Sequence, residues 1–169
     1  MLYWIWLSQI KGVGPKRQRL LLEKFNTPDK IYNASLEDLM ECPSIGRAIA
    51  KNIVAERSLE RAKTILDNAN SSNIKILTLD NPLYPQKSKD IEEMPILLYY
   101  KGKLVENSMG VAIVGSRRCS GYGKIVVHEA ATYLAEENIT VVSGMAKGID
   151  GYAHTSCIKA EGYTIAVLG

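Results

Sequence analysis

The sequence has little of what a metal site or a disulfide framework requires. Its 169 residues include three cysteines (Cys42, Cys119 and Cys157), widely spaced and without a CxxC pair, and two histidines (His128 and His154). An odd number of separated cysteines favours a reducing compartment over a disulfide framework. Because two histidines and three scattered thiols make a poor ligand set, we expect no bound metal.

Long apolar runs are also missing. The N-terminal stretch MLYWIWLSQIKGVG is apolar for only a few residues and has no basic segment before them, so it fits neither a signal peptide nor a membrane span. With 46% hydrophobic and 23% charged residues, the composition is that of an ordinary globular protein. We therefore expect a soluble, cytoplasmic protein with no membrane partner.

Positive charge is concentrated in the first third of the chain. Residues 1–63 hold 11 Lys and Arg against 7 Asp and Glu, and the remainder holds 10 against 11. This excess favours an anionic partner only weakly, because charged residues commonly form nothing more than a solvated face.

Residues 1–72 have the pattern of a small helical domain. Pro15 stands at a first-turn position before an apolar-periodic segment, and Ser35 with Asp38 forms a capping-box signature. Ser44 is a candidate N-cap for the segment IGRAIAKNIVAE. The short connections predict five or six helices.

Residues 73–169 change to an alternation of strands and helices. Strands are predicted at 74–79, 95–102, 110–115, 138–144 and 163–169, and helices at 122–137 and 150–160. Continuous apolar strands alternating with helices predict a parallel sheet covered on both faces, with the strand at 110–115 buried. The fold class is therefore α/β, with a Rossmann-like domain after the helical one. Because the chain stops directly after a strand, we expect that domain to be truncated, either within a longer protein or in an unusually short form.

The segment IKGVGPKR (residues 10–17) places two glycines, Gly12 and Gly14, around one valine between two helices, with Lys16 close by. Such a hairpin exposes backbone N–H groups beside a helix N-terminus, which suits a phosphate oxygen, and it resembles the helix-hairpin-helix motif of DNA-binding proteins. The equally weighted alternative is that the glycines merely permit a tight turn between the helices and bind no phosphate. A degenerate copy at ECPSIGRAIAK, with Ser44 in place of the first glycine, is interpreted as structural.

The segment IVGSRRCSGYG (residues 113–123) occupies the first βα turn of the Rossmann-like domain. The fingerprint GxGxxG is absent, as is an acidic residue at the end of the next strand, so we expect no nicotinamide cofactor. The loop offers amides, hydroxyls and guanidiniums for phosphate, from Gly115, Ser116, Arg117, Arg118 and Ser120. For Arg118, pairing with a surface carboxylate is the stronger alternative. Tyr122 is a candidate for base stacking, with core packing as its equal alternative.

The segment SGMAKGIDGYAH (residues 143–154) follows the adjacent strand. Its small residues indicate a backbone that something approaches closely, and it adds Ser143, Gly144, Lys147 and Gly148 to the predicted phosphate site. Asp150 is expected to cap the following helix, with His154 packed one turn later on the same face. Both would shape the loop, and an acid–base pair is the weaker alternative.

Both loops follow neighbouring parallel strands, so they should converge on one crevice at the carboxyl edge of the sheet. The crevice is rich in amides and cations. Paired acids of the glycosidase kind, a GxSxG elbow and a carboxylate cluster for two metals are all missing from the sequence. We therefore predict a site that holds phosphate and is not an enzyme active site.

The order of these segments resembles that of the DNA-processing protein A family (DprA, also called Smf). The segments that carry the resemblance are DNPLYP, MPILLYYKG, VGSRRCSGYG, VVSGMAKGIDGYAH and TIAVLG. The resemblance implies a cytoplasmic single-stranded DNA-binding protein of natural transformation and recombination. It also implies RecA recombinase as a partner, a homodimer, and a basic DNA pocket around the loop Gly115–Arg117.

Two alternatives stay open. Related Rossmann-like folds include nucleoside monophosphate phosphoribohydrolases, although their PGGxGTxxE loop is absent from this sequence. The helical domain could also be a protein-interaction module instead of a DNA contact.

Overall fold

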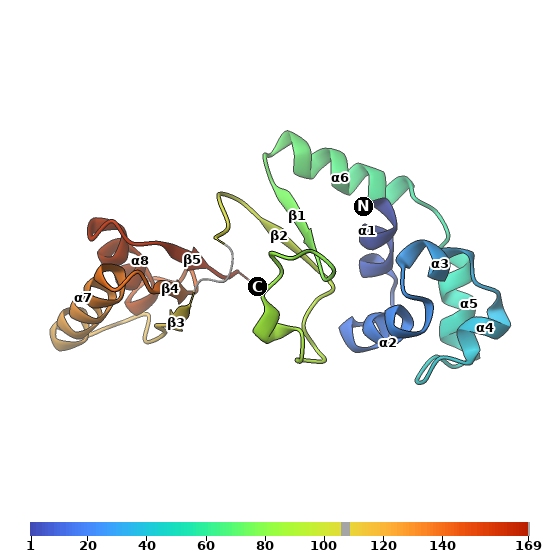
Figure 1. Ribbon diagram of the computed structural model, residues 1–169, viewed down its shortest axis with the longest axis horizontal. Helices are drawn as coiled ribbons and strands as arrows, with labels where there is room; N and C mark the ends of the chain where they lie inside the picture. Colours follow the sequence, from blue (N-terminus) through green and yellow to red (C-terminus); the bar gives the residue numbers. More distant parts are fainter. Residues whose placement is uncertain (106–108, 169) are drawn as a thin grey trace. The chain divides into compact units, whose positions relative to one another are not determined.

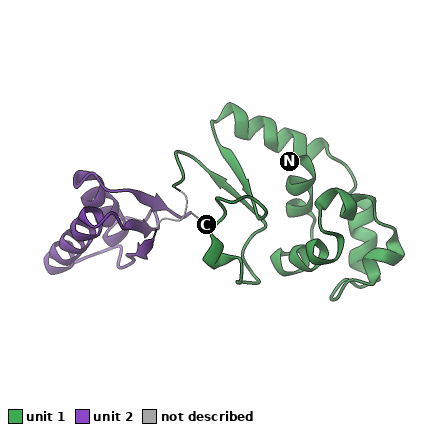
Figure 2. Ribbon diagram, viewed as in Figure 1, with its two compact units in different colours: residues 1–106 green, residues 107–169 purple. Residues whose placement is uncertain are grey.

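The computed structural model describes residues 1–105 and 109–168, which belong to two compact units, Met1–Glu106 and Asn107–Gly169 (Figures 1 and 2). The elements of unit 1 are α1 (Leu2–Gln9), α2 (Pro15–Phe25), α3 (Pro28–Asn33), α4 (Leu36–Met40), α5 (Arg47–Ala55), α6 (Glu60–Ser71), β1 (Lys75–Thr78), η1 (Gln86–Ser88) and β2 (Leu97–Tyr100). Those of unit 2 are β3 (Gly110–Ala112), α7 (Gly121–Glu136), β4 (Thr140–Ser143), α8 (Ile149–Lys159) and β5 (Thr164–Ala166).

Local signals start two helices of unit 1, α2 and α4, where the sequence predicts. Pro15 is the first residue of α2, and the capping box at α4 is formed, with the Asp38 N–H donating to Ser35 Oγ at 3.0 Å. The prediction that Ser44 caps α5 is wrong. Ser44 adopts a φ of 65°, which places it inside the preceding turn, and Gly46 is the N-cap residue.

The core of unit 1 joins its helices to its β-hairpin. Fully buried aliphatic side chains from α1, α2, α3 and α5 form one cluster with Ile96 and Leu97 at the start of β2. β2 pairs antiparallel with β1, so both strands belong to the helical unit. The compact unit therefore extends to residue 106, past the boundary at 72/73 that the change of sequence pattern suggests.

Unit 2 is a three-stranded parallel sheet in the order β3-β4-β5. α7 and α8 pack against each other and both contact β4, so they cover the same face, as two right-handed crossovers running in one direction require. The predictions of a sheet covered on both faces and of a buried strand at 110–115 are wrong for the described part of this unit. All of β3 is exposed, and Val114 is 72% exposed.

In the described ranges, every helix is too short or too polar to cross a membrane.

We expect Leu21→Ala in α2 to lower the free energy of unfolding by about 2–5 kcal/mol, because Leu21 is 0% exposed and truncation leaves a cavity. Met40→Ala is the matched control, since Met40 is 42% exposed and its truncation should cost about 0.5 kcal/mol or less. Urea unfolding followed by circular dichroism measures both. Equal costs would contradict the burial of Leu21.

Candidate functional site

The two glycine-rich loops of unit 2 are in direct contact. The Ile149 N–H, at the start of α8, donates to the Ser116 carbonyl at 3.2 Å. Gly148, just before it, has a φ of 89°, and a Cβ there would lie 2.3 Å from the Ser116 carbonyl oxygen and 2.7 Å from that of Arg117. Only glycine satisfies both the backbone conformation and the space. The loop after β3 is therefore held on the loop after β4.

Two further glycines make the same close approach. A Cβ on Gly115 would lie 2.7 Å from the Ile149 side chain, and one on Gly144 would lie 2.6 Å from Asp150 Oδ2. The small residues of both segments thus allow the chain to pack on itself.

The two serines of the first loop have local roles. Ser116 Oγ accepts from the Arg118 N–H at 3.1 Å and donates to the Arg118 carbonyl at 3.0 Å, which closes a tight turn. Ser120 Oγ accepts from the Gly123 N–H at 3.1 Å and caps α7. The Ser116 hydroxyl proton is consequently used inside the loop.

The basic side chains of the two loops have no ion-pair partner among the described residues. Arg117, Arg118 and Lys147 are exposed, and none of them forms an ion pair with a described carboxylate. The expected pairing of Arg118 with a surface acid is thus not found in residues 1–105 and 109–168. Three positive side chains stand on two loops that the backbone holds together.

The buried polar residues of the second loop shape it. Ser143 is 3% exposed, and its hydroxyl donates to the Ile113 carbonyl at 2.6 Å, which ties β4 to the end of β3. The prediction that Asp150 is the N-cap of α8 is wrong. Gly148 holds that position, and Asp150 lies in the first turn, 8% exposed.

His154 is a packed residue, as the favoured interpretation has it. Its Nε2–H donates to the Gly144 carbonyl at 2.6 Å, and Nδ1 lies 2.6 Å from Thr164 Oγ1. With both ring nitrogens engaged by groups other than Asp150, the acid–base alternative has no geometric support. His154 instead joins α8 to the ends of β4 and β5.

The starts of α7 and α8 carry an exposed tyrosine, Tyr122, and a contact between Lys124 and Tyr152. Tyr122 is 77% exposed, so its alternative of core packing is wrong. Lys124 Nζ lies 5.2 Å from the centroid of the Tyr152 ring, and hydrogen bonding to Tyr152 raises the pKa of Lys124. No signal in the sequence points to Lys124 or Tyr152, because their contact depends on how the two helices pack.

In unit 1 the two helical hairpins, α1–α2 and α4–α5, have the same backbone geometry. Gly12 (φ 81°) and Ser44 (φ 65°) take equivalent left-handed positions, each followed by a buried residue and then by a glycine N-cap. The Val13 N–H donates to the Ile10 carbonyl and the Ile45 N–H to the Cys42 carbonyl, both at 3.1 Å. The degenerate segment is thus a second hairpin.

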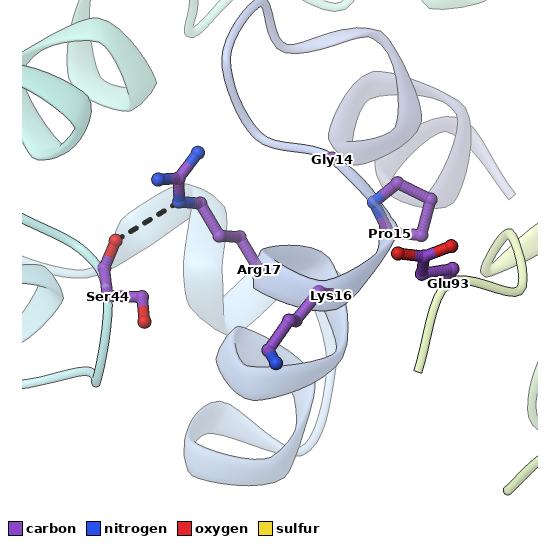
Figure 3. Close-up of a pocket in the computed structure, with 6 residues that line it drawn as sticks. All are labelled: Gly14, Pro15, Lys16, Arg17, Ser44 and Glu93. Carbon is purple, nitrogen blue, oxygen red and sulfur yellow. Dashed lines mark hydrogen bonds between the residues drawn. The ribbon is translucent and has the colours of Figure 1, made fainter. Parts of the chain in front are cut away.

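Side chains bridge the two hairpins. Arg17 Nε donates to the Ser44 carbonyl at 3.1 Å (Figure 3). Its Nη1 donates to the Gly12 carbonyl at 2.9 Å. A second bridge runs from α5 to the first hairpin, where Asn52 Nδ2 donates to the Lys11 carbonyl at 2.6 Å. Arg17 is therefore occupied by the fold.

Comparison with known proteins agrees with this geometry. Residues 75–169 match the model of the family described as DNA recombination-mediator protein A, and residues 7–58 match the SAM-like helix-hairpin-helix tandem. The chain belongs to the DNA recombination-mediator protein A family. The resemblance found in the sequence is confirmed, and so is the α/β class with hairpins preceding a Rossmann-like domain.

Individual relatives are longer than this chain. Protein Smf of Synechocystis is 34% identical over 172 residues, covering 99% of this chain and 43% of the relative. DNA processing protein DprA of Bacillus subtilis is 33% identical, covering 73% and 42%. The X-ray structure of DprA from Streptococcus pneumoniae has a TM-score of 0.70 at 29% identity, covering 99% of this chain and 57% of that one. The chain thus spans about two fifths of these two curated relatives.

The loop contact predicts opposite effects for two glycines three positions apart. Gly148→Ala should destabilise unit 2 by about 2–4 kcal/mol, from overpacking and backbone strain together. Gly151→Ala, whose Cβ would meet only the Ala146 carbonyl at 3.5 Å, should stabilise α8 by about 0.5–1 kcal/mol. Amide hydrogen exchange in α8 measures both. Equal protection in the two variants would contradict the contact.

Proposed function

We propose that unit 2 binds the phosphates of DNA in the crevice between its two loops, as a binding protein without catalytic activity. The observation that carries the proposal is the set of three exposed, unpaired cations, Arg117, Arg118 and Lys147, on loops held together at Gly148. Guanidiniums with neighbouring backbone amides suit phosphate oxygens, which accept hydrogen bonds and carry charge.

The first turn of α7 adds to this site. Its leading amides have no intrahelical partner, and the helix dipole favours an anion there. Ser116 and Gly115 hold the turn that presents Arg117, while Ser143, Gly144 and Gly148 hold the facing loop. We assign positioning roles to Asp150 and His154, because both are buried beneath that loop.

We infer that the DNA is single-stranded. Tyr122, exposed beside the arginine loop, offers a ring on which an unpaired base can stack, and stacking of this kind tolerates any base sequence. Relatives named DNA processing protein support the wider proposal, which is a cytoplasmic role in natural transformation and recombination. In that role the whole protein would assist RecA loading and act as a homodimer.

We also propose that the first hairpin makes a second contact with DNA, through the amides at Gly12 and Gly14 and the ammonium of Lys16. The match to a helix-hairpin-helix tandem over residues 7–58 supports this assignment over a purely protein-binding role. The hairpin lies in unit 1 and is testable separately from the crevice.

Arg117→Ala should weaken binding of labelled oligo-dT about tenfold at low salt, because the missing guanidinium no longer neutralises a phosphate. The slope of log affinity against log salt should become shallower by about 0.7 for each single-strand phosphate that the variant leaves unneutralised. Fluorescence anisotropy at several salt concentrations measures both quantities.

Lys159→Ala, at the opposite end of α8, removes the same charge and is the matched control. Binding that Arg117→Ala leaves unchanged, or that both variants weaken equally, would overturn the crevice as the DNA site.

A further inference from the structure

The segment from Lys89 to Pro95 is fastened to the first hairpin's second helix, α2. Arg19 Nη1 donates to the Lys89 carbonyl at 2.6 Å, and its Nε donates to the Met94 carbonyl at 3.1 Å. Tyr84, 1% exposed, donates its hydroxyl proton to the Pro95 carbonyl at 2.5 Å. Two side chains thus hold the backbone of this segment at both ends.

The fastening brings two carboxylates to the hairpin. Glu92 Oε2 lies 2.5 Å from Lys16 Nζ, and hydrogen bonding to Glu92 raises the pKa of Lys16. Glu93 lines a pocket of about 490 Å³ that Gly14, Pro15 and Lys16 also line (Figure 3). Acidic groups therefore occupy the start of α2, where a hairpin of this kind would receive a phosphate.

Three of the basic side chains around the hairpin already have partners in the fold. Arg17 donates to carbonyls of both hairpins, Arg19 donates to the 89–95 segment, and Lys16 pairs with Glu92. Within the described residues, Lys11 forms no ion pair. The hydrogen bonds hold Arg17 and Arg19 in place without changing their charge, whereas Glu92 offsets the charge of Lys16.

We propose that Glu92 and Glu93 screen the first hairpin from nucleic acid. The Glu92 carboxylate pairs with Lys16 where a phosphate oxygen of DNA would otherwise bind. The hairpin then engages DNA only when a phosphate displaces this internal anion. The inference rests on the proposed DNA contact of the hairpin and is independent of the crevice in unit 2.

The exposure of the pair sets the strength of this screen. The Lys16 and Glu92 side chains are 60% and 68% exposed, so solvent and salt weaken their attraction. Displacement is therefore easy for a polyanion, which brings several charges at once. The screen should reduce hairpin affinity by about three- to tenfold at low salt, the size expected of one or two surface ion pairs.

The test removes the two charges in a chain whose crevice is already disabled. Glu92→Gln/Glu93→Gln in the Arg117→Ala background should bind labelled oligo-dT or a labelled duplex about three- to tenfold more tightly than Arg117→Ala alone. Adding Lys16→Ala should cancel the gain. Because Arg19 and Tyr84 bond to backbone carbonyls, the glutamines leave the fastening in place.

A matched control separates screening from net charge. Glu60→Gln/Asp67→Asn changes the charge by the same amount on α6 and should leave affinity unchanged. An equal gain in this control, or a gain that survives Lys16→Ala, overturns the screen. So does an unchanged affinity in the Glu92/Glu93 variant.

The same experiment distinguishes the two proposals. If Arg117→Ala has no effect and the glutamine variant still binds more tightly through Lys16, the crevice fails and the screen stands. If Arg117→Ala weakens binding and the glutamines change nothing, the screen fails and the crevice stands.

Discussion

The crossing of two backbones at Gly148 is the contact that holds the two glycine-rich loops of unit 2 together. No side chain is present there to adjust a misfit, because the Ser116 and Arg117 carbonyls occupy the space where a Cβ would stand. The Ile149 N–H bond to Ser116 fixes the same crossing. The contact therefore fixes the backbone of Arg117 on the loop that follows the neighbouring strand.

Much of the fold is visible in the sequence because its signals are local. The capping box at Ser35, proline at the start of α2 and the apolar strands each depend on a few adjacent residues, and their elements formed within a few positions of the prediction. The left-handed turn at Ser44 is an exception, since a serine there gives no sign that it departs from the role of a cap.

The features that could not be predicted from the sequence depend on contacts between residues far apart in the chain. Coverage of the sheet depends on strand order, which places α7 and α8 on one face although the strands are apolar on both. The partners of the basic residues are also distant: Arg19 bonds to a carbonyl 75 positions away, and Arg17 to one 27 positions away. A charge count therefore does not reveal that the fold holds Arg17 and Arg19 in place, or that Glu92 pairs with Lys16.

The position of the tryptophans determines which unit gives tryptophan fluorescence. The sequence has two tryptophans, Trp4 and Trp6, and both lie in α1. The Trp6 indole donates to the Glu56 carbonyl at 2.7 Å and its ring packs edge-on against Tyr32, so its emission senses the junction of three helices. Emission excited at the red edge of the tryptophan absorption band therefore comes from unit 1, and the Rossmann-like unit contributes no tryptophan emission.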